Sequence, residues 1–137
     1  MTPDPLQIVL DLAGRDVLVD LATAAADGTP HVATAAHVER DGDRLRATAW
    51  FCPTTVENLQ HNPRVAVVVR SREPGSGYQV LGRVEAVTDR AMLNGHDPAA
   101  DPGDPPPQVQ RDLTIAVERV LDFADAHHTD APLPESP

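Results

Sequence analysis

Alternation of apolar and polar positions predicts that most of this chain is β-structure. Over Arg44–Phe51 the apolar residues share one face, which is the period of a strand. The turns Asp27-Gly28 and Asp41-Gly42 favour hairpins, so the first three strands are expected to form a meander. The run Ala66–Val69 predicts a strand that is buried on both faces. Five strands are predicted here: Val17–Ala25, Pro30–Glu39, Arg44–Phe51, Arg64–Arg70 and Tyr78–Thr88.

Two short segments in the first half of the chain have helix signals. In the first, Leu6, Val9 and Leu12 belong to an apolar stripe that closes at Gly14, which predicts a short packing helix.

Within the fifth strand, Gly82 predicts a bulge or a bend of the kind that a barrel corner needs.

The second helix is expected to follow Pro53. Thr54 and Glu57 fit a capping box, and Asn62-Pro63 ends the helix after about two turns. The helix start presents unpaired amides at the end of the preceding strand, which favours an anion such as phosphate. In the alternative interpretation Glu57 already occupies these donors, and the turn is only a connector.

The C-terminal third has a weaker pattern. A short helix is expected to begin at Asp89–Leu93, and Asn94–Pro107 is a Pro-, Gly- and Asp-rich loop of the kind that is functional or mobile. The apolar residues of Gln108–Ala126 fit a helix and a strand equally well. We predict a single domain over residues 1–128 and a disordered tail over residues 129–137.

Composition limits the classes of partner. Apolar residues make up 41% of the chain but aromatic residues only 3%, so the core is expected to be thin and completed by a second subunit. A net charge of −10 argues against nucleic acid and anionic membranes as partners. All eleven cationic residues are arginine, which excludes a lysine Schiff base. We expect a cytoplasmic protein, because no stretch resembles a signal or membrane segment.

Few side chains stand out as chemical groups. The single cysteine, Cys52, excludes an internal disulfide, and a lone cysteine after a strand usually serves packing. His37 is expected to be a surface or hydrogen-bonded strand histidine. His127, His128 and Asp130 lie in the predicted tail, where ligands have no fixed geometry, so no metal site is predicted. No residue is identified as a catalytic acid or base.

Five or six short strands in this order predict a small antiparallel barrel, and three motifs make the chain similar to a known family. These are Asp27-Gly28 between two strands, Asn58-Leu59 followed by Asn62-Pro63-Arg64-Val65, and Gly82-Arg83-Val84-Glu85. In this order and spacing they resemble the pyridoxamine 5′-phosphate oxidase-like split-barrel flavoproteins, over roughly Leu21 to Val87.

The resemblance implies a mainly β fold, a six-stranded antiparallel split β-barrel with short helices, in which Leu113–Val120 is the last strand. It also implies a homodimer with FMN, or in some branches a deazaflavin or heme, in a groove between the subunits. The implied phosphate contacts are Arg46, Thr48, Thr54 and Thr55.

Further positions follow from the same resemblance. Asn58 would brace the turn at the helix, and Thr34, Ala35 and Ala36 would face the isoalloxazine ring. Trp50 would pack against that ring or line the dimer seam, and its alternative is an ordinary place in the core.

One departure leaves two functions open. Many FMN-binding members have a lysine three residues before the asparagine of Asn58-Leu59, where this chain has Thr55. The expected function is that of a flavin (FMN)-dependent oxidoreductase moving electrons or hydride between a reduced nicotinamide or oxygen and an unknown small molecule. The alternative is a non-catalytic split-barrel protein that has lost tight FMN binding and holds heme, a deazaflavin, another small ligand or no cofactor. The arginine patterns of a true pyridoxamine phosphate oxidase are missing, so vitamin B6 synthesis is not expected.

Overall fold

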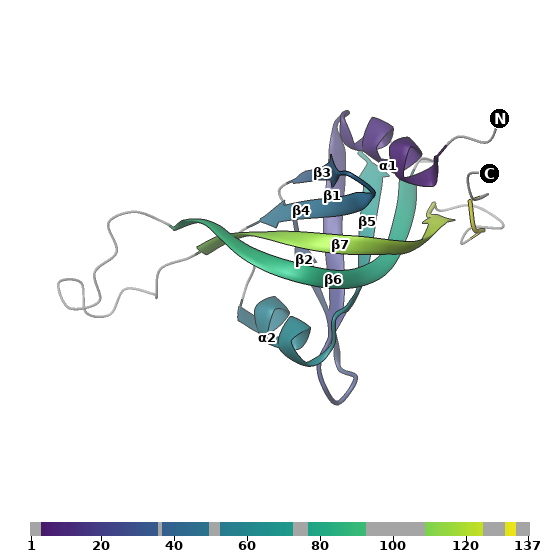
Figure 1. Cartoon of the computed structure of the whole chain (residues 1–137). Coiled ribbons are helices and arrows are strands. Elements are labelled where there is room, and N and C mark those ends of the chain that lie inside the picture. Colours follow the sequence, from purple (N-terminus) through teal and green to yellow (C-terminus); the bar gives the residue numbers. More distant parts are fainter. Residues whose placement is uncertain are drawn as a thin grey trace.

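The protein is a single antiparallel sheet with two short helices (Figure 1). The computed structural model describes residues 4–35, 37–49, 53–72, 77–92, 109–124 and 131–133. The strand order in the sheet is β2-β1-β5-β6-β7-β4-β3. The elements are α1 (Pro5–Ala13), β1 (Val17–Ala24), β2 (Pro30–Thr34), β3 (His37–Asp41), β4 (Arg44–Ala49), α2 (Pro53–His61), β5 (Arg64–Ser71), β6 (Gly77–Met92) and β7 (Val109–Asp122).

The two edges of this sheet are neighbours in sequence, and this forces the sheet to curl. β2 ends at Thr34 and β3 begins at His37, so only two residues join one edge to the other. The three Cα–Cα steps from Thr34 to His37 span at most about 11 Å, so the edges come close together where the chain crosses between them. The expected mainly β antiparallel split barrel with short helices is therefore confirmed, with seven strands in place of six.

The extra strand comes from a break in the segment predicted as one strand, Pro30–Glu39. Val32 is 66% exposed, whereas Val38 beyond the break is only 8% exposed. In one continuous strand these two residues would share a face. The prediction of a single strand and a three-strand meander is therefore wrong, because the pattern changes phase where the chain leaves one sheet edge for the other.

Local signals explain α1 and the two hairpins. Asp4 caps α1 by accepting a hydrogen bond from the Leu6 N–H at 3.1 Å, and the helix ends at Gly14 as predicted. The apolar stripe is buried against the barrel, as expected. Gly28 and Gly42 have φ of 91° and 62°, the left-handed values that the predicted Asp-Gly turns require.

β6 and β7 form a long bent ribbon. The pairing slips between Leu81 and Gly82, and a Cβ on Gly82 would collide with the carbonyl oxygen of Ala116, so the predicted bend at Gly82 is confirmed. The ambiguous C-terminal segment is a strand, as the resemblance implied. The helix expected from Asp89 is wrong, because β6 continues to Met92 in pairing with β7.

The core is aliphatic and thin. Its fully buried large side chains include Leu21, Leu45, Leu113 and Ile115. On β5 one face is buried, but the opposite face, at Ala66 and Val68, is only half-buried in the single chain. The prediction of burial on both faces therefore holds for one face only.

Part of the predicted tail is paired with the barrel. The Asp122 N–H donates to the Ala131 carbonyl and the Leu133 N–H to the Val120 carbonyl, both at 2.9 Å. The expectation of a disordered tail did not anticipate this pairing. The predictions for Ala36, Trp50, Cys52, Asn94–Pro107 and the histidine pair at 127–128 lie outside the described residues.

Within the described ranges, neither helix is long and apolar enough to cross a membrane. The same ranges contain no group of three or more histidine, cysteine, aspartate or glutamate side chains placed to hold a metal ion.

Candidate functional site

The start of α2 differs from the prediction in a way that favours an anion. The helix begins at Pro53, two residues before Thr55, where a capping box with Thr54 as N-cap would start it. Thr54 therefore lies inside the first turn, and the predicted capping box is wrong. Glu57 consequently lies beyond the first turn, which contains no acidic residue. The interpretation in which Glu57 occupies the helix donors therefore fails. Because proline has no N–H and suits the first helical position, any backbone donors at this helix start come from the amides that follow Pro53.

A buried amide anchors this helix to the barrel. Asn58 is 5% exposed, and its Nδ2 donates to the Oγ1 of Thr23 on β1 at 3.0 Å. The backbone carbonyl of Asn58 accepts a hydrogen bond from the Asn62 N–H, at the turn where α2 ends. Thr55 is fully buried, whereas Thr54 is exposed. Thr54 is therefore the hydroxyl of the pair that an external ligand can reach in the single chain.

The two predicted contacts on β4 are already engaged with carboxylates. The Nε and Nη2 atoms of Arg46 both lie 2.9 Å from Oε1 of Glu39, and Nη1 lies 4.0 Å from Asp41. The Thr48 hydroxyl is fully buried and donates to Asp112 on β7. Arg46 has five N–H donors, so its contacts with Glu39 leave three for another acceptor.

The strand register brings together Arg46 with Glu39 and Thr48 with Asp112. Glu39 lies opposite Arg46 and His37 opposite Thr48 in the β3–β4 hairpin, while Asp112 lies opposite Thr48 from β7. Sequence reasoning missed Glu39 and Asp112. Counting outward from the Asp41-Gly42 turn could have paired Glu39 with Arg46, but Asp112 depends on a strand distant in sequence.

The predicted ring-facing segment is only partly in the described chain. Thr34 is exposed at the end of β2. The Ala35 N–H donates to the Val19 carbonyl at 2.9 Å, so this amide serves the sheet and is not free for a ring. Arg46 and Thr48 thus lie two residues apart on β4, opposite Glu39 and His37 of β3. Thr54, Thr55 and Asn58 all lie on α2.

The donor set fits the phosphate of a flavin nucleotide in part. The first turn of α2 supplies amides and the exposed Thr54 hydroxyl without any carboxylate. Arg46 supplies three further N–H groups, but the charge of Glu39 offsets its own.

Comparison with known proteins supports the same family. A family model described as pyridoxamine 5′-phosphate oxidase matches residues 12–120. No curated protein matches the chain.

Several solved structures share the fold. HupZ of Group A Streptococcus is 21% identical, with a TM-score of 0.62 over 91% of this chain and 97% of its own. A protein named F420 reductase is 22% identical, with a TM-score of 0.58 over 80% of this chain and 93% of its own. An FMN-binding protein of Syntrophomonas wolfei is 14% identical, with a TM-score of 0.56 over 89% of this chain and 93% of its own.

Such low identities establish the fold alone. The family assignment rests on the family model, which covers most of the chain from α1 to the end of the barrel. The chain belongs to the pyridoxamine 5′-phosphate oxidase family.

Proposed function

We propose that the protein is an FMN-dependent oxidoreductase that works as a homodimer on a small molecule. The observation that carries this proposal is the first turn of α2, which contains the exposed Thr54 and no acidic residue. The bond between Asn58 and Thr23 fixes this turn to the barrel. Membership of the family and the likeness to an FMN-binding protein support the choice of cofactor.

In this proposal the chain positions the cofactor and supplies positive charge to its phosphate. The first turn of α2 holds the phosphate, and Arg46 adds a cation whose orientation Glu39 maintains. When bound, the flavin supplies the electron or hydride transfer.

The outer face of β1, β2 and β5 supports the dimer. Ala22 lies opposite Val32 on one side and Ala66 on the other, so the three share one face. Val32 is 66% exposed, and Ala66 is half-buried. A second subunit on this face would remove the exposed apolar surface from water.

The visible spectrum and cofactor titrations test this function. We expect the purified protein to show flavin absorption that a reduced nicotinamide bleaches, and the cofactor-free protein to bind FMN more tightly than riboflavin. A protein that binds neither flavin has no flavin-dependent activity and contradicts the proposal.

A binding module for a deazaflavin or heme is the second candidate. It is favoured by two observations: Arg46 is offset by Glu39, and Thr55 is fully buried where related sequences carry a lysine. The likeness to a protein named F420 reductase is compatible with a deazaflavin. The same titration, carried out with a deazaflavin and with heme, distinguishes the two candidates.

A further inference from the structure

A pocket of about 410 Å³ is lined in part by the start of α1. In Figure 1, α1 and α2 lie at opposite ends of the barrel. The pocket is bounded by the start of α1, the β3–β4 hairpin, the end of β7 and residues 132–133. None of the residues assigned to the cofactor lines it. Its volume falls in the range of small-molecule sites, roughly 300–1,000 Å³.

The pocket has an apolar floor. Leu6 and Val120 are 5% and 6% exposed, and both belong to the core. Val117 and Leu133 are half-buried beside them and pack against the same core. Leu133 occupies this place because its N–H is bonded to the Val120 carbonyl. The surface that a ligand covers in this pocket is therefore partly hydrocarbon, beside a larger polar share.

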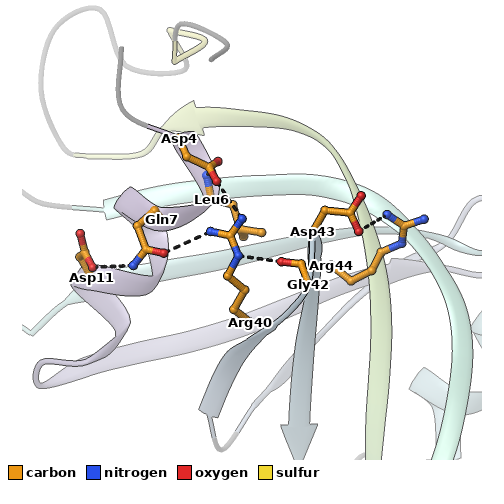
Figure 2. Close-up of polar contacts among 8 residues, drawn as sticks. All are labelled: Asp4, Leu6, Gln7, Asp11, Arg40, Gly42, Asp43 and Arg44. Atoms are coloured by element: carbon orange, nitrogen blue, oxygen red, sulfur yellow. Dashed lines mark hydrogen bonds and ion pairs between the residues drawn. The ribbon is translucent and has the colours of Figure 1, made fainter. Parts of the chain in front are cut away.

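One arginine in the wall is fixed in position. The Arg40 guanidinium donates from Nη2 to Asp4 at 2.8 Å, from Nη1 to Gln7 at 3.1 Å and from Nε to the Gly42 carbonyl at 2.7 Å (Figure 2). These contacts use three of its five N–H donors. Arg40 therefore keeps one N–H donor on each terminal nitrogen. Because its guanidinium is already held in place, binding a ligand would not cost the entropy of ordering it.

Arg44 is held on the other side of the hairpin turn. Its Nη1 lies 2.8 Å from Asp43, as Figure 2 shows, and its Nε donates to Glu85 on β6. The hydrogen bond from Arg44 to Glu85 raises the pKa of Arg44. Arg44 retains three N–H donors, so two guanidinium groups of the wall are oriented and still have donors to offer.

The third arginine has a different environment. Arg119 on β7 is exposed, and its guanidinium has no hydrogen-bond or ion-pair partner among the described residues. The carboxylates of the wall, in contrast, are all paired, since Asp4 contacts Arg40, Asp43 contacts Arg44 and Glu118 lies 3.6 Å from Arg64. Arg119 is therefore the one arginine of the wall without an ion-pair partner among the described residues, although the wall contains three arginines and three carboxylates in all.

This charge pattern selects the ligand. The unpaired guanidinium of Arg119 suits a single carboxylate, which accepts two parallel N–H bonds from a guanidinium. A phosphate dianion would also meet the three carboxylates of the wall, which lie in the same pocket. The apolar floor calls for a hydrocarbon body on the ligand.

We propose that this pocket is a binding site for small monocarboxylates with an apolar body, with Arg119 as the carboxylate anchor. The site is separate from the cofactor region, so it stands whether or not the protein binds FMN.

Octanoate is a suitable test ligand in amide NMR titrations of the full chain. We expect octanoate to shift the amide signals of Leu6 and of Val117–Val120 in a saturable manner. Octanol, which has the same body without the charge, and inorganic phosphate are the matched comparisons, and both should bind at least about tenfold more weakly. Octanol binding as tightly as octanoate, or octanoate shifts confined to other strands, would overturn the proposal.

A pair of variants distinguishes a specific contact with Arg119 from a nonspecific effect of removing one positive charge. Arg119→Gln should weaken octanoate about tenfold, because a charge-assisted hydrogen bond is lost. Arg83→Gln removes the same charge from β6, where Arg83 is likewise exposed and has no partner among the described residues but does not line the pocket. Its octanoate affinity should equal that of the wild type. Equal losses in both variants, or no loss in Arg119→Gln, would contradict the assignment. Unchanged signal dispersion elsewhere shows that each variant is folded.

Discussion

At the scale of single residues, the candidate cofactor site combines a helix start without acidic residues and an arginine, Arg46, that is paired with Glu39. Its helical half was accessible from sequence, because Thr54 and Asn62-Pro63 predict where a helix lies. The partners of Arg46 and Thr48 were not, since Glu39 and Asp112 depend on strand register. Capping-box spacing misplaced the helix start by two residues, because Pro53 takes the first helical position.

The ion pair between Arg46 and Glu39 makes a testable prediction for FMN. Glu39→Gln removes the opposing charge and should tighten FMN about two- to fivefold, as exposed ion pairs have modest energies. Riboflavin, which lacks the phosphate, should bind as before. Fluorescence titration measures both affinities.

Asp16→Asn is the matched control, because it breaks another exposed pair, with Arg72 at 2.6 Å. An equal gain for riboflavin, or an equal effect of the control, would mean that Arg46 does not contact the phosphate.

At the scale of elements, local signals succeeded wherever the interaction is local. The stripe of α1 and the two Asp-Gly turns needed only neighbouring residues. The break after Thr34 was not predictable, because small residues on both sides give no signal for a change of face. The helix expected at Asp89 failed because pairing with β7 extends the strand.

The cap of α1 should make stability depend on pH. The hydrogen bond from Arg40 and the Leu6 N–H hold the pKa of Asp4 below its ordinary value. A lowered pKa in the folded state stabilises the protein above the unfolded-state pKa, about 3.9, and this contribution is lost as the pH falls through the folded value. Asp4→Ala should therefore lower the free energy of unfolding by about 1 kcal/mol at pH 7 and by less at pH 3.

Urea denaturation at the two pH values measures this difference. Asp11→Ala, on the last turn of the same helix, controls for loss of one negative charge. A penalty for Asp4→Ala that is the same at both pH values would show that the carboxylate charge has no part in the cap.

At the scale of the whole molecule, the fold was predictable from alternation and motif order, but the exposed face was not. The alternating pattern assigned Val32 to a strand but did not indicate its exposure, which is 66% on the edge strand β2. The same face carries the half-buried side of β5.

A charge placed on this face should separate the proposed dimer. We expect Val32→Asp to be monomeric at micromolar concentration and the wild type to be dimeric, because burying an unpaired carboxylate is costly. Val87→Asp is the control, since Val87 is 44% exposed on β6. Light scattering coupled to gel filtration measures the mass. A monomeric wild type, or dissociation by both variants, would place the interface elsewhere or exclude it.

The position of β7 between β6 and β4 has a consequence for how the chain is made. Thr48 and Asp112 meet across the β4–β7 pairing although 64 residues separate them. During synthesis, β4 therefore leaves the ribosome with one edge unpaired and stays so until the last strand emerges. Such distant pairing makes folding slow, and an open strand edge can pair with another nascent chain. Translation that stops before β7 should thus yield aggregates and not a smaller barrel.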